Sequence, residues 1–215
     1  LIAILQHTGN SHASYSVFCG SGNNGGDGLA IARMLFKLGK TVHVYVLNSD
    51  SPSPDFLENQ KRFSALQPIH PIIHESGFPK PDSNDIIIDA LLGTGINRPA
   101  EGLMAALIRH INQTGNPVIS IDLPSGMFAD KANAADDAIV EATHTLTFHA
   151  PKLSFYCAAN ERVTGTWEVL DIGLLKAGEE ELVTHFFVTK VEDIRSFLMT
   201  RKRFGYKNQF GHALM

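Results

Sequence analysis

Short apolar runs alternate with longer amphipathic stretches along most of the chain. Continuous apolar runs predict buried strands at residues 15–19, 41–47, 69–74, 85–92, 117–121, 143–148 and 164–170. Apolar positions that recur every three or four residues predict helices at 29–38, 56–66 and 101–111. Residues 1–5 resemble the end of a helix, 6–14 a polar loop and 186–188 a last edge strand. Because parallel strands need crossover connections, this alternation predicts an α/β fold: a Rossmann-like, doubly wound, mostly parallel sheet in a three-layer α/β/α sandwich.

A glycine-rich stretch joins the first predicted strand to the first predicted helix. Its sequence is Gly20-Ser21-Gly22-Asn23-Asn24-Gly25-Gly26-Asp27-Gly28. Glycine has no Cβ, so backbone N–H groups here can approach a ligand closely, and the helix N-terminus that follows favours phosphate. The G-x-G-x-x-G pattern alone is a weak signal, and a turn without a ligand is the alternative. The paired amides and Asp27 go beyond that pattern, because a carboxylate beside a phosphate site indicates a cation or a sugar hydroxyl as its partner.

Two further predicted strands end in turns that are rich in glycine and oxygen-bearing side chains. The strand at 85–92 contains Asp89 and leads into Gly93-Thr94-Gly95-Ile96-Asn97-Arg98-Pro99. The strand at 117–121 leads into Asp122-Leu123-Pro124-Ser125-Gly126. Ligands of open α/β sheets bind outside the carboxyl ends of the strands, so we expect residues 22–27, 93–99 and 122–126 to line one pocket. Taken alone, Asp89 also fits a solvated acid, and Asp122 also fits a helix N-cap.

Composition narrows the classes of function. The 215 residues carry a formal net charge of −4, which argues against a nucleic-acid-binding surface. No apolar run approaches the length of a membrane span, and the ten histidines lack zinc-ligand spacing. The two cysteines, Cys19 and Cys157, make no disulfide framework, so we expect a reducing compartment, the cytoplasm.

Five sequence blocks, in this order, are similar to the YjeF N-terminal domain family of NAD(P)H-hydrate epimerases. They are the glycine-rich stretch, 89–95, 121–126, 145–148 together with Lys152, and 171–173. The resemblance implies an isomerase that repairs nicotinamide cofactors. Such an enzyme interconverts the R and S forms of hydrated NADH and NADPH (NADHX and NADPHX) at C6 of the nicotinamide ring. Residues 1–190 are expected to form this domain.

The resemblance also implies roles for particular residues. Potassium is the implied cofactor, with Asn24, Asp89 and Ser125 as ligands, all of which offer the oxygen atoms that a hard cation prefers. Asp122 and Lys152 are the implied catalytic residues, since a carboxyl group can exchange a proton with the C6 hydroxyl. Lys152 is the second candidate, for proton transfer or phosphate pairing, and a solvated lysine is its alternative. The implied substrate-binding residues are Asn23, Asn24, Gly25, Gly26, Asp27, Gly93, Thr94, Gly95, Ile96, Asn97, Arg98, Pro99 and Asp122.

The C-terminal residues differ from those of a lone epimerase. Residues 191–215 are expected to hold a basic linker and the start of a second domain, because 207–214 resembles the first strand of the ribokinase-like NAD(P)H-hydrate dehydratase. The chain is then the epimerase part of a fused, multifunctional enzyme, whose lyase activity lies in the following domain. A homodimer stays open as the quaternary structure.

Two other functions also stay open. The G-x-G-x-x-G pattern fits a Rossmann NAD-dependent oxidoreductase, but Asn48 stands where such an enzyme has a ribose-binding acid, and Asp50 comes late. A non-catalytic module that binds nucleotide, RNA or protein is the second alternative. The joint presence of the implied ligands and catalytic side chains favours an enzyme, because a scaffold has no need of that set.

Overall fold

The computed structural model describes residues 1–8, 14–173, 185–198 and 203–204. The chain divides into two units, Leu1–Leu174 and Leu175–Met215. The first unit holds every described strand and positions the site. The division lies ahead of the boundary expected after residue 190, and the segment 207–214, expected to begin a second domain, falls outside the described residues.

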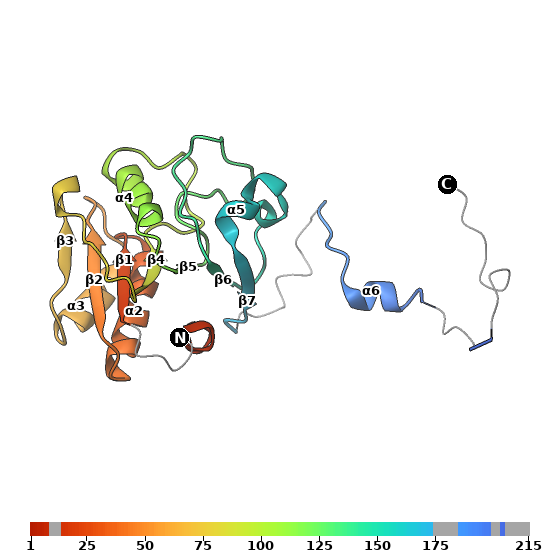
Figure 1. Ribbon diagram of the computed structural model, residues 1–215, viewed down its shortest axis with the longest axis horizontal. Helices are drawn as coiled ribbons and strands as arrows, with labels where there is room; N and C mark the ends of the chain where they lie inside the picture. Colours follow the sequence, from red (N-terminus) through yellow and green to blue (C-terminus); the bar gives the residue numbers. More distant parts are fainter. Residues whose placement is uncertain (9–13, 174–184, 199–202, 205–215) are drawn as a thin grey trace. The chain divides into compact units, whose positions relative to one another are not determined.

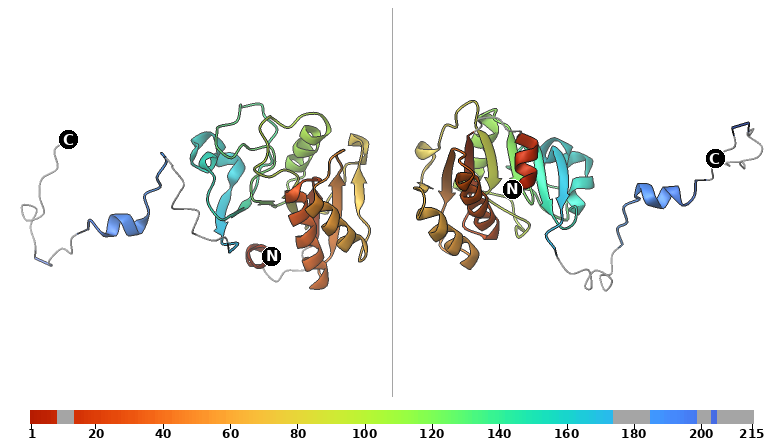
Figure 2. Two further views of the ribbon diagram at one scale, coloured as in Figure 1. Left: turned by 180° about the vertical axis from the view of Figure 1, so that it is seen from behind. Right: turned by 90° about the horizontal axis from the view of Figure 1, so that it is seen from below.

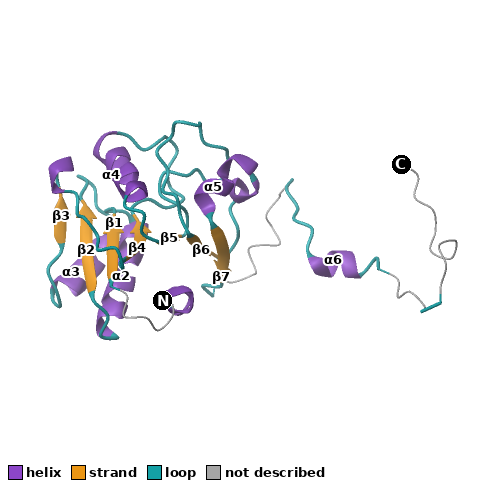
Figure 3. Ribbon diagram, in the orientation of Figure 1, coloured by secondary structure: helices purple, strands orange, loops and turns teal. Residues whose placement is uncertain are grey.

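Seven strands form one sheet in the order β3-β2-β1-β4-β5-β6-β7 (Figure 3). They are β1 Tyr15–Cys19, β2 Val42–Leu47, β3 His70–Ile72, β4 Ile86–Ala90, β5 Val118–Ile121, β6 His144–Phe148 and β7 Thr166–Leu170. Every pairing is parallel, so the predicted doubly wound α/β fold is confirmed, and the sheet is parallel throughout. The order reverses between β1 and β4, since the chain adds β2 and β3 on one side of β1 and the later strands on the other. Such a reversal opens a crevice at the carboxyl ends of the two strands.

Helices cover both faces of this sheet. On one face lie α1 (Ile2–Thr8), α2 (Asn23–Lys37) and α3 (Pro54–Ser64), and on the other lies α4 (Gly102–Gln113) (Figures 1 and 2). Short helical turns occupy the connections: η1 (Glu75–Gly77), η2 (Leu153–Tyr156), η3 (Ala158–Asn160) and α5 (Glu161–Thr164). The second unit contains α6 (Val191–Arg195). Among the residues that the structure describes, no helix is both long and apolar enough to cross a lipid bilayer.

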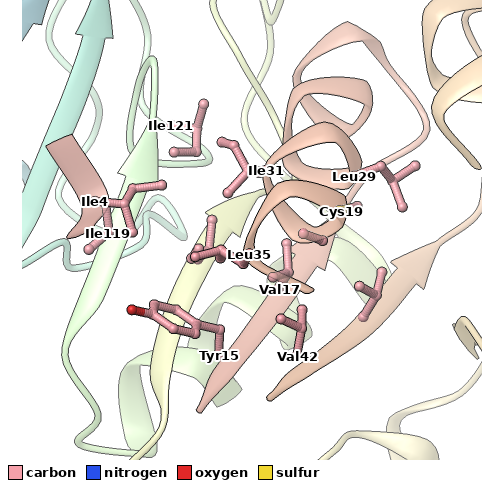
Figure 4. Packing of buried hydrophobic residues seen from close by; sticks show 14 of the residues in the cluster. Ile4, Tyr15, Val17, Cys19, Leu29, Ile31, Leu35, Val42, Ile119 and Ile121 are labelled. Atoms are coloured by element: carbon pink, nitrogen blue, oxygen red, sulfur yellow. The ribbon is translucent and has the colours of Figure 1, made fainter. Parts of the chain in front are cut away.

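The sheet has an apolar core on each face. Successive residues of β1 point to opposite faces, so Val17 joins the core under α2, whereas Phe18 joins the core under α4. Figure 4 shows the first core, in which Ile31 and Leu35 of α2 and Ile4 of α1 lie over the strands. Burial on both faces explains why the strands are continuous apolar runs rather than alternating ones.

The helix α2 begins at Asn23, ahead of its predicted start at Leu29. The prediction was wrong because glycine is a poor helix former, so the glycine-rich stretch indicated a loop. Packing outweighs that propensity here. A Cβ on Gly25 would lie 1.7 Å from the carbonyl oxygen of Gly20, so only glycine lets the first turn of α2 sit directly on the end of β1. Asp27 therefore stands on a helix and not in a loop.

Other boundaries differ from the predictions by less. The helix α1 continues through residues 6–8, which were expected to be a loop, and β3 covers only part of the predicted 69–74. The predicted edge strand at 186–188 is wrong, because these residues are irregular and exposed. An apolar run of three residues forms a strand only where it finds a sheet edge to pair with.

Candidate active site

A pocket of about 730 Å³ opens at the carboxyl ends of β1, β4 and β5, where the strand order reverses. The segments that follow these three strands contribute Gly20, Ser21, Gly22, Asn23, Asn24, Asp27, Leu91, Leu92, Gly93, Thr94, Gly95, Ile96 and Asp122. The volume is within the range of about 300–1,000 Å³ that is usual for small-molecule sites. The structure thus brings the three glycine-containing turns together.

The N-terminus of α2 forms one wall of the pocket. Gly22 is its N-cap residue, has an extended backbone and leaves the helix without a side-chain cap. A Cβ on Gly22 would meet nothing within 4 Å, so the space beside it is open. The first N–H groups of a helix have no intrahelical acceptor and carry partial positive charge. This wall is therefore suited to a phosphate group.

Asp27 lies one turn further along α2 and lines the same pocket with an exposed side chain. No lysine or arginine in the described part of the chain pairs with it. Loss of hydration beside the pocket walls raises the pKa of Asp27 to about 6, and the negative charges of Asp122 and Asp55 add to the rise. The pKa of Asp27 therefore lies closer to neutral pH than that of a solvated aspartate, and a minor fraction of the group is protonated at neutral pH.

Asp122 follows β5 directly and is held by β6 and the turn after it. Its Oδ1 lies 3.0 Å from Lys152 Nζ and accepts the backbone N–H of Phe148 at 3.2 Å. Its φ of 68° lies in the left-handed region, which non-glycine residues adopt rarely and often at functional sites. No helix begins here, so the N-cap alternative is wrong. The result is a carboxylate in one fixed position on the pocket wall.

Lys152 does not line the pocket, and its ammonium group is paired with nearby acceptors. Besides Asp122, its Nζ donates to the carbonyl oxygens of Phe148 at 3.1 Å and Ala150 at 3.3 Å. An ammonium group has three N–H donors, so these three acceptors account for all of them. The solvated-lysine alternative is wrong, since the side chain is only 17% exposed. The geometry favours Lys152 as the group that positions and charge-balances Asp122.

Asp89, in β4, is fully buried beside the pocket. Its two oxygens accept the N–H groups of Leu91 at 3.3 Å and Ser125 at 2.9 Å, and the hydroxyls of Ser120 at 2.7 Å and Ser125 at 2.5 Å. Burial raises the pKa of Asp89, and these hydrogen bonds oppose the rise. The alternative of a solvated acid is therefore wrong.

Asn24 joins α2 to this buried group. Its Nδ2 donates to the carbonyl oxygen of Leu92 at 3.0 Å, and Ser125 Oγ accepts the N–H of Leu92 at 2.9 Å. The Oδ1 of Asn24 is buried and has no hydrogen-bond partner. A buried polar atom is rarely left unpaired, and a buried carboxylate is costly without a cation. Asn24, Asp89 and Ser125 thus surround the turn at Leu92. In the described part of the chain, the Asp89 carboxylate there has no cationic partner and the Oδ1 of Asn24 has no hydrogen-bond partner.

Residues 1–154 match the family described as YjeF-related protein N-terminus, and this range includes the pocket and Lys152. The chain belongs to that family. Among similar proteins, the bifunctional NAD(P)H-hydrate repair enzyme Nnr of Escherichia coli K12 is 33% identical over 201 residues, which cover 93% of this chain and 38% of that protein. The NAD(P)H-hydrate epimerase of Limosilactobacillus fermentum is 34% identical over 169 residues, 79% of each chain. The chain therefore spans well under half the length of the bifunctional relative.

A solved structure shares the fold of this YjeF-family chain. The crystal structure of yeast ynu0, YNL200c, superimposes with a TM-score of 0.59 and 19% identity, covering 71% of this chain and 68% of that one. The likeness supports the arrangement of sheet and helices.

The residues expected to bind substrate in this YjeF-family chain fall into three groups. Those that line the pocket are Asn23, Asn24, Asp27, Gly93, Thr94, Gly95, Ile96 and Asp122. Asn97, Arg98 and Pro99 instead line a second pocket of about 410 Å³, which shares Leu92, Gly95, Ile96 and Met104 with the first. Gly25 and Gly26 line neither pocket, and a Cβ on either would meet backbone atoms, those of Gly20 and of Asp55 respectively. The expectation of one pocket for 22–27, 93–99 and 122–126 is corrected accordingly, since 123–126 also lie outside the lining.

One wall of the pocket was missed by the sequence predictions. The connection from β2 to α3 contributes Asn48, Ser49, Ser51 and Ser53 to the lining. It is tied to the end of β1, since the hydroxyls of Ser21 and Ser49 are 2.6 Å apart and the N–H of Ser53 donates to the carbonyl oxygen of Ser21 at 2.8 Å. The cluster of Ser49, Ser51 and Ser53 directly after a strand was the available signal, since hydroxyl groups there can face a ligand at the carboxyl end of the sheet. Asp50, the acid between them, lines neither pocket.

Proposed function

We propose that this chain is an NAD(P)H-hydrate epimerase, which interconverts the R and S forms of NADHX and NADPHX at C6 of the nicotinamide ring. The observation that carries the proposal is the fixed carboxylate of Asp122 in the same pocket as the uncapped N-terminus of α2. The first can exchange protons and the second can bind the phosphates of a dinucleotide. Family membership and the names of the similar proteins support the same function.

The chemistry follows from the atoms around C6. This carbon carries the hydroxyl group and is bonded to the ring nitrogen. When the hydroxyl leaves as water, the nitrogen shares the positive charge, and a water that returns to the other face gives the other epimer. In this proposal Asp122 exchanges a proton with the oxygen at C6, and the ion pair with Lys152 keeps its carboxylate in one orientation.

We propose potassium as the ion held by the buried group beside the pocket. The unpartnered Oδ1 of Asn24 and the Oγ of Ser125 would hold it, and Asp89 would balance its charge. A single carboxylate among neutral oxygens suits a hard monovalent cation. Asp89 already accepts four hydrogen bonds, the capacity of a carboxylate, so a direct contact with the ion requires the release of one of them. The bound ion supplies positive charge beside the turn that carries Gly93.

We further propose that the chain is the epimerase part of a fused enzyme whose other domain is a dehydratase with lyase activity. Its alignment with 38% of a bifunctional relative supports this arrangement. The cytoplasmic location stays a prediction, with which the free thiols of Cys19 and Cys157 are compatible. The homodimer stays a prediction as well.

The oxidoreductase alternative receives less support from the site. Asn48 directly follows β2 and lines the pocket, at the position where a dehydrogenase has an acid that binds ribose. A binding module without activity would not need the strained backbone of Asp122 or its ion pair.

The test is an epimerisation assay with purified protein. R-NADHX is incubated with the protein in potassium chloride or in tetramethylammonium chloride at equal ionic strength, and the two epimers are separated by chromatography. We expect conversion to the equilibrium mixture, faster in potassium. Conversion at the rate without protein would overturn the proposed function, and equal rates in the two salts would overturn the potassium assignment alone.

A further inference from the structure

Two carboxyl groups reach the pocket from different elements. Asp27 comes from the second turn of α2, and Asp122 from the turn after β5. The turn after β4 lies between them in the strand order and contributes residues 91–96 to the same lining. Neighbouring strands are about 4.8 Å apart, so β1, which leads into α2, and β5 are separated by about 10 Å. The pocket thus offers a flat ring bound over the turn after β4 one carboxyl group from the β1 side and one from the β5 side.

The two carboxyl groups differ in charge compensation. Asp122 is paired with the ammonium group of Lys152 at 3.0 Å and accepts the backbone N–H of Phe148 at 3.2 Å. Asp27 has no cationic partner in the described part of the chain. The charged groups that act on it are Asp55, from the first turn of α3, and Asp122 across the pocket, and both favour its protonated form. One carboxyl group thus has a cation beside it, whereas only other carboxyl groups act on the second.

Inversion at C6 needs two such groups. The hydroxyl leaves from one face of the ring, and the new water arrives at the opposite face. A single side chain reaches one face only, so a proton donor and a proton acceptor on opposite sides serve the reaction best.

We propose that Asp27 is the second catalytic residue of the epimerisation: it protonates the C6 hydroxyl that leaves on its side, while Asp122 takes a proton from the water that adds on the other side. This role rests on the proposed function. The C6–O bond breaks with its electron pair on oxygen, the proton of Asp27 joins that oxygen, and one water departs. A second water bonds to C6 on the opposite face and gives one proton to Asp122. Asp122 then releases its proton to solvent and Asp27 takes one up, which restores both groups, and in the reverse direction the two groups exchange roles.

The first test is the kinetics of Asp27→Asn. A general acid contributes about 10²–10⁴-fold, so we expect kcat to fall within that range while KM changes little. A residue that only binds substrate would raise KM and leave kcat at the parental value. Asp27→Glu restores a carboxyl group and is expected to recover part of kcat. Asp50→Asn removes the same charge from an exposed position outside the pocket and serves as the matched control.

The second test follows the oxygen at C6 in ¹⁸O-water. In Asp27→Asn, only the epimer whose hydroxyl faces Asp122 should exchange its oxygen, without inversion, and in Asp122→Asn only the other epimer should do so. Exchange lost equally from both epimers, or a parental kcat in Asp27→Asn, overturns the role of Asp27 while the parent still epimerises. A parent protein that leaves R-NADHX unconverted overturns the proposed function, and this role with it.

Discussion

At the scale of single residues, three aspartates near one edge of the sheet have three different surroundings. Asp89 is buried among four hydrogen-bond donors, Asp122 is paired with Lys152, and Asp27 faces the pocket with no cationic partner among the residues that the structure describes. The same type of side chain is therefore a buried group held by hydrogen bonds, a group fixed by an ion pair and a pocket-facing group with a raised pKa. The sequence places all three near glycine-containing turns, but burial and charge partners come from distant elements and had to be observed.

The change Asp122→Asn tests the fixed base. Asparagine keeps the shape of the side chain and can still accept the N–H of Phe148, but it cannot take up a proton. We expect epimerisation to fall by about 10²–10⁴-fold, with folding retained. The measurement is kcat on R-NADHX, with circular dichroism to verify the fold. Turnover at the parental rate would leave Asp122 with a structural role only.

The change Asp55→Asn tests the electrostatics of Asp27. The negative charge of Asp55 helps to raise the pKa of Asp27 to about 6. Without that charge the pKa falls, a smaller fraction of Asp27 is protonated near neutral pH, and an acid-catalysed rate decreases. We expect the descending limb of the pH–rate profile to move to lower pH. The control is Asp50→Asn, whose profile should match that of the parent, and an unmoved limb in Asp55→Asn would contradict the expectation.

At the scale of elements, strands were easier to predict than the start of α2. A strand buried on both faces leaves a continuous apolar run, as in β4, and no neighbouring element changes that signal. The first two turns of α2 are helical only because glycine lets them approach the end of β1, a contact between segments that local propensity does not contain. For the same reason the sequence did not predict the pocket wall formed by residues 48–53. The position of this wall depends on how the connection after β2 folds against Ser21.

Gly25→Ala tests whether this close approach sets the position of α2. Its Cβ would lie 1.7 Å from a backbone oxygen, which cannot move without displacing β1. We expect the free energy of unfolding to fall by about 1–3 kcal/mol. In a chain of this size the melting temperature falls by about 2–4 °C per kcal/mol. Gly22→Ala is the matched control, because its Cβ meets nothing within 4 Å, and a similar loss in both variants would contradict the packing explanation.

At the scale of the whole unit, the site follows from the topology of the sheet. The strand order reverses between β1 and β4, and the turns that follow these strands lie at that reversal. The sequence predicted that the turns after β1, β4 and β5 lie together, because the carboxyl ends of parallel strands lie at the same edge of a sheet. The separation of 97–99 into a neighbouring pocket could not, because it depends on the path of one loop.

The proposed potassium ion would couple the site to the stability of the whole unit. Asp89 links β4 to β5 through Ser120 and to the turn after β5 through Ser125. Its charge is buried without a cation in the described part of the chain, which is a cost to the folded state. An ion that binds only the folded state offsets this cost and stabilises the protein by mass action, by about 2.7 kcal/mol at a concentration 100 times its dissociation constant.

Two serine substitutions separate this effect from ordinary hydrogen bonding. Ser120→Ala and Ser125→Ala each remove one hydroxyl that donates to Asp89, so each should cost about 1–3 kcal/mol in the free energy of unfolding. Only Ser125 also belongs to the group of oxygens that would hold the ion. We therefore expect potassium chloride, compared with tetramethylammonium chloride at equal ionic strength, to raise the melting temperature of the parent and of Ser120→Ala, but not of Ser125→Ala. An equal rise in both variants would place the ion elsewhere, because Ser125 would then contribute no more than Ser120 does.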